Sequence, residues 1–326
     1  MKVAVVTGVS SGIGQATAAR LAKSGYRTFG TVRSAIDSHP DIELVRVDVR
    51  DRDSVEEGIA SIFERAGRID VLVNSAGSAL ISAAEETSTE EARELFETNV
   101  FGVMRMTQAV LPAMREQRSG RIINISSVLG FLPAPFMSVY AATKHAVEGY
   151  SESLDHEVRN FGVRVIVVEP GFTRTNLGRH NGNVHPVSEY SMDRERVAAS
   201  IGENIDHGAD PATVADVVVR AATARTPALH YQVGANARLL RVLRSIAPAS
   251  LVDRGIRKEF GLDRSPGPSP SLRSGSGPPS RQGEGRSPAR PSPSGEEPAL
   301  SERSESKGAP ERSEGADEGR DLGVAS

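Results

Sequence analysis

The sequence contains no cysteine among its 326 residues. Disulfide bonds, a thiol nucleophile, and zinc or iron–sulfur sites built on cysteine are therefore excluded. A chain without cysteine fits the reducing cytoplasm, which is the location we expect, although such a chain can fold in any compartment.

Long apolar runs and a large net charge are also lacking. No stretch reaches the roughly 18 apolar residues that a membrane-spanning helix needs. The run after Met1, KVAVVTG, is too short for the apolar part of a signal peptide. The formal net charge is −3, so we do not expect a nucleic acid as partner.

The composition changes near Leu262. From residue 263 to residue 326 the chain has no aromatic residue, few large aliphatic residues and many prolines. Such a segment cannot bury enough apolar surface to offset the entropy cost of ordering it. We therefore predict one folded domain over residues 1–262 and a disordered, low-complexity tail over residues 263–326, which either binds a partner or has no role.

The first 262 residues alternate strand-like and helix-like segments. KVAVVT, YRTFGTV, IELVRVDV, DVLVNSAG, RIINIS and VRVIVVEPG have the composition of buried strands, and residues 13–23, 54–65, 89–117 and 139–160 have helical periodicity. This alternation predicts a Rossmann-type, doubly wound α/β fold with a parallel sheet covered on both faces. Ligands of that fold bind beyond the carboxyl ends of the strands.

The first strand ends in TGVSSGIG, which places Gly8, Gly12 and Gly14 in a turn before a helix. Glycines permit a tight turn and a close approach of the backbone to a phosphate, and the helix N-terminus favours the anion. A lone glycine triplet also occurs in ordinary turns. Here the triplet follows a strand and opens a helix, which favours dinucleotide binding.

The ends of the next strands indicate which dinucleotide binds. The second strand ends at Val32 and Arg33, where folds that prefer NAD usually carry an acidic residue. An arginine can instead pair with the 2′-phosphate of NADP. We therefore predict NADP(H) as the preferred cofactor, with NAD(H) possible if Arg33 is only a solvated charge. Asp48, which ends the third strand, would lie near the adenine.

Tyr140 and Lys144 lie four residues apart in VYAATKHAVEGY and so share one helical face. A free phenol has a pKa of about 10, which a nearby positive charge lowers. The pair is either a tuned proton donor or an ordinary surface pair. Ser127 ends the fifth strand and would join them if both elements face one crevice. Thr173 and Thr175 follow the sixth strand and would reach a carboxamide or a phosphate.

The segments TGVSSGIG, NSAG, ISS, YAATK and PGFTRT, in this order and at this spacing, resemble the motif set of the short-chain dehydrogenases/reductases. The resemblance covers roughly residues 1–262, and the glycine spacing resembles the core-length branch of the family. FGTVRS and PFMSVYAATKHAVEGYSESLDHE look most like the hydroxysteroid and retinol dehydrogenases, which act on lipophilic carbonyls. The resemblance implies an NADP(H)-dependent oxidoreductase that interconverts a carbonyl and an alcohol.

The resemblance also implies residue roles. Tyr140 would be the general acid in reduction and the base in oxidation, and Lys144 would bind the nicotinamide ribose and lower the phenol pKa. Ser127 would bind the substrate oxygen, and Asn99 would hold a water that links Lys144 to solvent. The implied cofactor contacts are Gly8, Ser10, Ser11, Gly12, Ile13, Gly14, Arg33, Asp48, Val49, Asn74, Ala76, Gly77, Tyr140, Lys144, Pro170, Gly171, Thr173 and Thr175.

Two positions depart from the family pattern. Ser75 stands where the family commonly has asparagine, and Thr173 stands where it commonly has an aliphatic residue. Both contacts are made largely by backbone, and neither position belongs to the four expected catalytic residues.

Apolar residues near these motifs indicate the class of substrate. They are Phe131, Leu132, Phe136, Met137, Phe172 and Leu177, and they either edge a site for a lipophilic substrate or pack in the core or at a subunit interface. Residues 178–190 fit a mobile lid. Its His180 and His185 are expected to be solvated, and we predict no metal site.

The segment 237–260 pairs apolar positions with several arginines. It suits a membrane surface, but a helix packed on the body or on a partner subunit is favoured. We therefore expect no membrane contact, a homo-oligomer (dimer or tetramer), and a small carbonyl or alcohol as substrate. Two alternatives stay open, a non-catalytic NADP(H) sensor and an NAD-dependent alcohol dehydrogenase. A sensor could lose its tyrosine, serine or lysine, and this chain retains all three.

Overall fold

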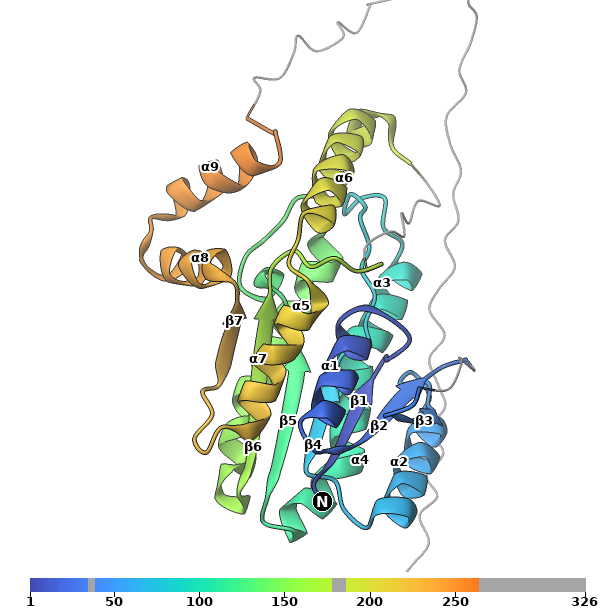
Figure 1. Cartoon of the computed structure of the whole chain (residues 1–326). Helices are drawn as coiled ribbons and strands as arrows, with labels where there is room; N and C mark the ends of the chain where they lie inside the picture. Colours follow the sequence, from blue (N-terminus) through green and yellow to red (C-terminus); the bar gives the residue numbers. More distant parts are fainter. Residues whose placement is uncertain (35–38, 178–185, 264–326) are drawn as a thin grey trace, which may run out of the picture. The chain divides into compact units, whose positions relative to one another are not determined.

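The protein forms a parallel α/β sheet in the computed structural model, which describes residues 1–34, 39–177 and 186–263 (Figure 1). In the described residues the sheet has seven strands in the order β3-β2-β1-β4-β5-β6-β7, all parallel. They are β1 (Val3–Thr7), β2 (Arg27–Val32), β3 (Glu43–Arg46), β4 (Val71–Asn74), β5 (Gly120–Ile125), β6 (Val163–Pro170) and β7 (His230–Val233). The predicted Rossmann-type fold is confirmed.

The sequence pattern predicted the first six strands and missed β7. This strand has only four residues, His-Tyr-Gln-Val, and the first three are only partly buried. An edge strand of this kind lacks the continuous apolar run that marks a buried strand. The predicted tail, apart from residue 263, lies outside the described residues, as do His180 and His185. The last described residues still pack on the domain, since Phe260 is buried and Leu262 lies against it.

The helices fill the intervals between strands much as the sequence predicts. They are α1 (Gly12–Lys23), α2 (Arg52–Ala66), α3 (Thr89–Phe96), α4 (Gly102–Glu116), α5 (Ser138–Val158), α6 (Ser191–Asp206), α7 (Pro211–Thr223), α8 (Ala235–Ile246) and α9 (Ala249–Glu259). The single helix predicted over residues 89–117 is divided by a π-helical turn, η1 (Glu97–Phe101). Such turns are frequent at functional sites. Among the described helices, none combines the length and the apolar character that crossing a membrane requires.

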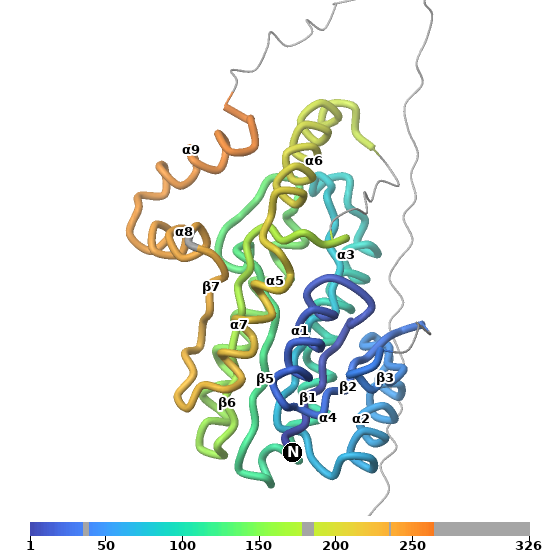
Figure 2. Tube along the Cα trace, viewed as in Figure 1, coloured from blue at the N-terminus to red at the C-terminus, as the bar shows by residue number. Residues whose placement is uncertain are grey.

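Two aliphatic cores hold the helices on opposite faces of the sheet, because successive strand residues point to opposite faces. Val6 belongs to the core under α1 and α7, and Val5 belongs to the core under α2, α4 and α5. Figure 2 shows α1 and α7 together on the near side of the sheet. Since all strands run in one direction, their carboxyl ends share one edge, and that edge carries Thr7, Val32 and Asn74.

Candidate active site

The glycine turn brings the end of β1 close to the end of β4. Gly8 has a φ of 72°, and a Cβ atom on it would lie 2.9 Å from the Cα atom of Ala76. A Cβ atom on Gly14 would lie 2.3 Å from the carbonyl oxygen of Gly8. The hydroxyl of Thr7, a residue that the sequence did not single out, accepts hydrogen bonds from the backbone N–H groups of Ser75 and Ala76, both at 2.9 Å. Positions 8 and 14 of this turn therefore require glycine.

Helix α1 begins at this turn without a side-chain cap. Its N-cap residue Ser11 makes no capping hydrogen bond, and no acidic residue stands in the first turn. Ser10 and Ser11 are exposed, and Gly12 and Ile13 are partly exposed. The free N–H groups and the positive end of the helix dipole therefore suit a phosphate.

Two arginines lie at the neighbouring strand ends. Arg33 is exposed directly after β2. Arg50, which the sequence analysis did not select, donates to Asp48 at 2.6 Å, and this hydrogen bond, with a smaller effect of the Arg33 charge, holds the pKa of the Asp48 carboxyl below its usual value. Val49 is buried. The edge of the sheet next to α1 therefore carries positive charge.

The side chain of Asn74 does not face the crevice that the sequence suggested. It is buried, and its amide donates to Asn124 at 2.8 Å and to Thr107 at 3.4 Å. Asn124 in turn donates to Ser151 on α5. The Asn74 side chain thus ties β4 to β5 and to the helices, which leaves its backbone and the exposed Gly77 for cofactor contact.

Asn99 lies on the π-helical turn and is 1% exposed. Its amide oxygen accepts from the Ser78 N–H at 2.9 Å, and its amide nitrogen donates to the Ser78 carbonyl at 2.9 Å and to Thr143 at 3.1 Å. Thr143 precedes Lys144 on α5. Asn99 therefore joins the loop after β4 to the helix that carries Tyr140 and Lys144.

Ser127, Tyr140 and Lys144 come together at the carboxyl end of β5. Tyr140 and Lys144 are 5% and 7% exposed, so they are not a surface pair. The phenol of Tyr140 is hydrogen-bonded to Ser127. The Lys144 ammonium donates to the Ile125 carbonyl at 2.9 Å and lies 5.7 Å from the centre of the Tyr140 ring.

Burial dominates the titration of this pair. It raises the pKa of Tyr140 to about 12, although the hydrogen bond with Ser127 opposes the rise. Burial also lowers the pKa of Lys144 to about 8, against the attraction of Glu148. The net shift of the phenol is therefore opposite to the lowering predicted from Lys144, because burial raises the pKa and the hydrogen bond with Ser127 offsets only part of the rise.

The segment after β6 approaches the start of α1. Pro170 ends the strand beside Val233 of β7, and the Thr173 hydroxyl donates to the Gly171 carbonyl at 3.1 Å. Thr175 lies so close to α1 that a Cβ atom on Gly12 would meet its methyl group at 3.1 Å.

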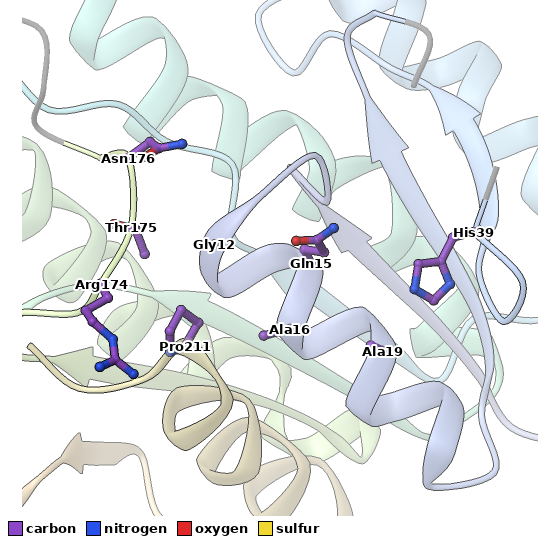
Figure 3. Close-up of a pocket in the computed structure, with 9 residues that line it drawn as sticks. All are labelled: Gly12, Gln15, Ala16, Ala19, His39, Arg174, Thr175, Asn176 and Pro211. Atoms are coloured by element: carbon purple, nitrogen blue, oxygen red, sulfur yellow. The ribbon is translucent and has the colours of Figure 1, made fainter. Parts of the chain in front are cut away.

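A cavity of about 390 Å³ opens between this segment and α1 (Figure 3). Figure 3 shows Arg174, Thr175 and Asn176 facing Gln15 and Ala16 across it. Neither Ser127 nor Tyr140 lines the cavity. It therefore lies at the α1 end of the candidate site, away from Ser127 and Tyr140.

Apolar side chains surround Tyr140 on the other side. The cluster contains Ala79, Ile81, Leu95, Ala134, Met137, Val197, Ile201 and Phe260, with Phe136 packed against it. Of the residues predicted to edge the site, Leu132 is buried, whereas Phe172 and Leu177 are 38% and 37% exposed. The Phe131 ring lies 5.1 Å from the guanidinium of Arg241. The predicted apolar wall is thus partly core and partly surface.

Comparison with known proteins identifies the family. Residues 2–184 match the profile of the short chain dehydrogenases. The 3-ketodihydrosphingosine reductase of Bacteroides thetaiotaomicron is 35% identical over 237 residues, which cover 72% of this chain and 88% of that protein. This chain belongs to the short-chain dehydrogenase/reductase family. The predicted membership of this family is confirmed, and so is the predicted enzyme class, an oxidoreductase.

Solved structures of short-chain dehydrogenases share the fold of this enzyme. One from Streptomyces avermitilis is 35% identical, with a TM-score of 0.68, and the match covers 81% of this chain and 98% of that one. Another, from Burkholderia cenocepacia, was solved in complex with NADP. It is 27% identical, with a TM-score of 0.63 and coverages of 78% and 98%.

A buried charged cluster lies one helical turn beyond Lys144 of this dehydrogenase/reductase. Glu148 on α5 is 6% exposed, and Glu169 at the end of β6 is fully buried. His230 on β7 contacts both carboxylates, Glu148 at 3.4 Å and Glu169 at 3.0 Å. Arg241 on α8 also pairs with Glu169. The cluster joins α5, β6, β7 and α8 behind the active site.

Two cations of the enzyme, His230 and Arg241, lie among the carboxylates of the cluster. Burial lowers the pKa of His230, but the hydrogen bonds with Glu148 and Glu169 raise it by a larger amount. The net pKa of His230 is about 9. In the described residues, Glu148, Glu152 and His230 form the one group whose ligand-type atoms all lie within 4.8 Å of one another. Because His230 is charged at neutral pH and Arg241 lies 3.9 Å from Glu148, the carboxylates already have counter-charges.

The sequence carried a signal for part of this cluster. Glu169 is a charged residue within the apolar run VRVIVVEP, and a buried charge requires a partner. Glu148 stands four residues after Lys144, on the same face of α5. No sequence signal indicated His230, because it lies 61 residues from Glu169 in a strand that was not predicted.

We expect His230→Gln to destabilise the enzyme in a pH-dependent manner. The pKa of His230 is raised by folding, so its contribution is fully present below about pH 6.5 and is lost as the pH rises through about 9. The free energy of unfolding should fall by about 2 kcal/mol at pH 6 and by much less at pH 9.5. Urea unfolding at several pH values measures this, with His207→Gln, an exposed histidine after α6, as control. A loss that is equal at all pH values would contradict the assignment.

Proposed function

We propose that this enzyme is an NADP(H)-dependent oxidoreductase that interconverts a carbonyl and an alcohol on a lipophilic substrate. The observation that carries the proposal is the interaction of the partly exposed Ser127 hydroxyl with the buried Tyr140 phenol, with the buried Lys144 beside it, at the carboxyl edge of the sheet. A phenol and a serine hydroxyl are the donors that a carbonyl oxygen requires as negative charge develops on it.

The residues at the edge of the sheet fit a nicotinamide dinucleotide. The turn from Gly8 to Gly14 and the uncapped start of α1 would hold the pyrophosphate. Arg33, with Arg50 nearby, would pair with a 2′-phosphate. The NADP complex of the Burkholderia relative supports this choice over NAD. The bound cofactor would supply or accept the hydride, and the protein orients the carbonyl and moves the proton.

Tyr140 is in the protonation state that reduction needs. With a pKa of about 12, its phenol carries a proton at neutral pH and donates it to the carbonyl oxygen, while the Ser127 hydroxyl holds that oxygen in place. Lys144, with a pKa of about 8, is mostly charged at neutral pH and would bind the ribose hydroxyls. Its charge, close to the phenol ring, stabilises the phenolate that remains after the transfer.

Asn99 and the π-helical turn would complete a route for the proton. Asn99 contacts Ser78 and Thr143, and Thr143 is adjacent to Lys144 in sequence. We propose that Asn99 positions a water beside Lys144, through which the phenol regains its proton from solvent.

The apolar cluster around Tyr140 supports a lipophilic substrate. Met137, Ala134 and Ile81 are buried with Tyr140 in one cluster, so the proton donor lies in an apolar wall. The Bacteroides relative, one-third identical, is named as a reductase of a ketone-bearing sphingoid lipid. We therefore place the substrate among long-chain or polycyclic carbonyl compounds.

A series of methyl ketones of increasing chain length tests the substrate class. We expect kcat/KM with NADPH to rise about three- to fourfold per methylene over the first additions, as apolar burial of about 0.8 kcal/mol per methylene requires. Ketones of matched length with a terminal hydroxyl serve as controls. A value of kcat/KM that is flat or falls with chain length would contradict a lipophilic substrate.

A further inference from the structure

Helix α8 turns its apolar face away from the protein. Leu239, Val242, Leu243 and Ile246 are 57%, 52%, 41% and 73% exposed. Their spacing of three, four and seven residues places them on one face of the helix. The opposite face is the one that contacts the domain. It carries Ala237, which is buried.

The inward face is held by polar contacts. Arg241 pairs with the fully buried Glu169 and stacks over the ring of Phe131 at 5.1 Å. These contacts fix the rotation of α8 about its axis, so the outward direction of the apolar face follows from the ion pair. The sequence analysis expected this helix to pack its apolar face on the body or on a partner, and on the body it does not.

Helix α9 continues the same surface. Ile256 packs against the apolar cluster that contains Tyr140 and Phe260, whereas Leu251 is 55% exposed. We use the term basic apolar face for the exposed side chains of both helices. It consists of Leu239, Val242, Leu243, Ile246 and Leu251, with Arg238, Arg254 and Lys258 exposed around them.

The charge of this face differs in sign from that of the whole chain. Residues 235–259 contain six basic and two acidic residues, whereas the chain has a formal net charge of −3. Long basic side chains can extend beside an apolar stripe with their charges in the headgroup region of a bilayer. Figure 1 shows α8 and α9 following the edge strand β7 at the outer side of the sheet.

We propose that the basic apolar face binds the surface of an anionic lipid bilayer. Such a bilayer suits both kinds of side chain on this face. The apolar side chains would enter the boundary of the acyl chains, and the basic side chains would contact the negative headgroups. A second copy of the chain fits less well. In a symmetric contact the same patch lies on both sides, so Arg238 and Arg254 would approach their own copies.

Binding to a bilayer does not depend on the proposed reaction, but it is compatible with a lipophilic substrate. The end of α9 and Tyr140 belong to one apolar cluster, so a bilayer at this face would lie next to the wall of the site. Vesicle binding is measured without substrate or cofactor, so its absence and the absence of the proposed reaction are separate results.

Flotation of the full chain with vesicles tests the proposal. We expect the enzyme to float with vesicles of phosphatidylcholine and phosphatidylglycerol at low salt and to remain below with phosphatidylcholine alone. The double variant Leu243→Glu, Ile246→Glu should reduce the floating fraction at least tenfold, and Arg254→Glu, which reverses an exposed charge beside Leu251, should reduce it several-fold. Met192→Glu, which changes a 75% exposed methionine on α6, should float like the wild type.

Two results would overturn the proposal. One is a wild-type enzyme that does not float with the anionic vesicles. The other is a double variant that floats as well as the wild type while keeping its circular dichroism and melting temperature. Light scattering is measured on the same samples. Loss of a dimer in the double variant, without vesicle binding by the wild type, would make the face a subunit interface instead.

Discussion

Replacing Tyr140 with phenylalanine should lower kcat for carbonyl reduction by about 10²- to 10⁴-fold, the range that a positioned proton donor contributes. The substitution removes one oxygen and retains the ring in its apolar cluster, so the fold should persist. Because Lys144 keeps its hydrogen bond to the Ile125 carbonyl, the Kd for NADPH should change by less than about threefold. Stopped-flow turnover and fluorescence titration of NADPH measure the two quantities separately.

Tyr150→Phe is the matched control for this variant. Tyr150 lies on the same helix α5, is partly buried, and makes a hydrogen bond with Thr107 rather than with the active site. We expect near wild-type kcat for Tyr150→Phe. Near-normal turnover in Tyr140→Phe would refute its role as proton donor, and loss of NADPH affinity without loss of kcat would make it a cofactor contact only.

Replacing Arg33 with alanine should raise the KM for NADPH by about 10- to 100-fold and leave the KM for NADH within about threefold. A charge-assisted hydrogen bond contributes about 1.5–3 kcal/mol, and each 1.4 kcal/mol is tenfold in affinity. Arg33 is exposed directly after β2, so its removal leaves no buried charge unpaired and no cavity. Initial rates with the two cofactors, on one ketone substrate, give the ratio.

Arg115→Ala controls for the loss of one positive charge. Arg115 is exposed in the last turn of α4, which leads into the amino end of β5, and it should leave the preference unchanged. If Arg33→Ala also leaves the NADPH-to-NADH ratio unchanged, Arg33 is a solvated charge. Arg50, which pairs with Asp48, would then be the candidate for the 2′-phosphate.

Local sequence signals predicted most of the fold and the helical face that Tyr140 and Lys144 share. Glycine spacing and strand-to-helix alternation suffice for β1 to β6 and for the turn at Gly8, because each signal lies within a few residues. The four-residue spacing of Tyr140 and Lys144 placed them on one face of a helix, as observed. The π-helical turn at Asn99 was not predicted, because the amphipathic pattern of the sequence is continuous there. Nothing in that pattern indicates the extra residue that a π-helical turn inserts.

Features that depend on contacts distant in the sequence were not predictable. The Asn74 side chain binds Asn124, 50 residues away, and this contact turns it from the expected cofactor crevice. The pKa of Tyr140 is raised by burial among residues of α6 and the loop before α3, which are distant from it in the sequence. The outward apolar face of α8 follows from the pairing of Arg241 with Glu169, 72 residues apart. Composition and spacing contain none of these relations.

The most direct test of the account measures NADPH consumption and alcohol formation together in one sample of the wild-type enzyme with a long-chain ketone. We predict that one alcohol forms for each NADPH consumed, at a rate that is much lower with NADH. Tight binding of NADPH without any alcohol formed across long-chain and polycyclic ketones would contradict the account, and the protein would then be a sensor of NADP(H) rather than a reductase.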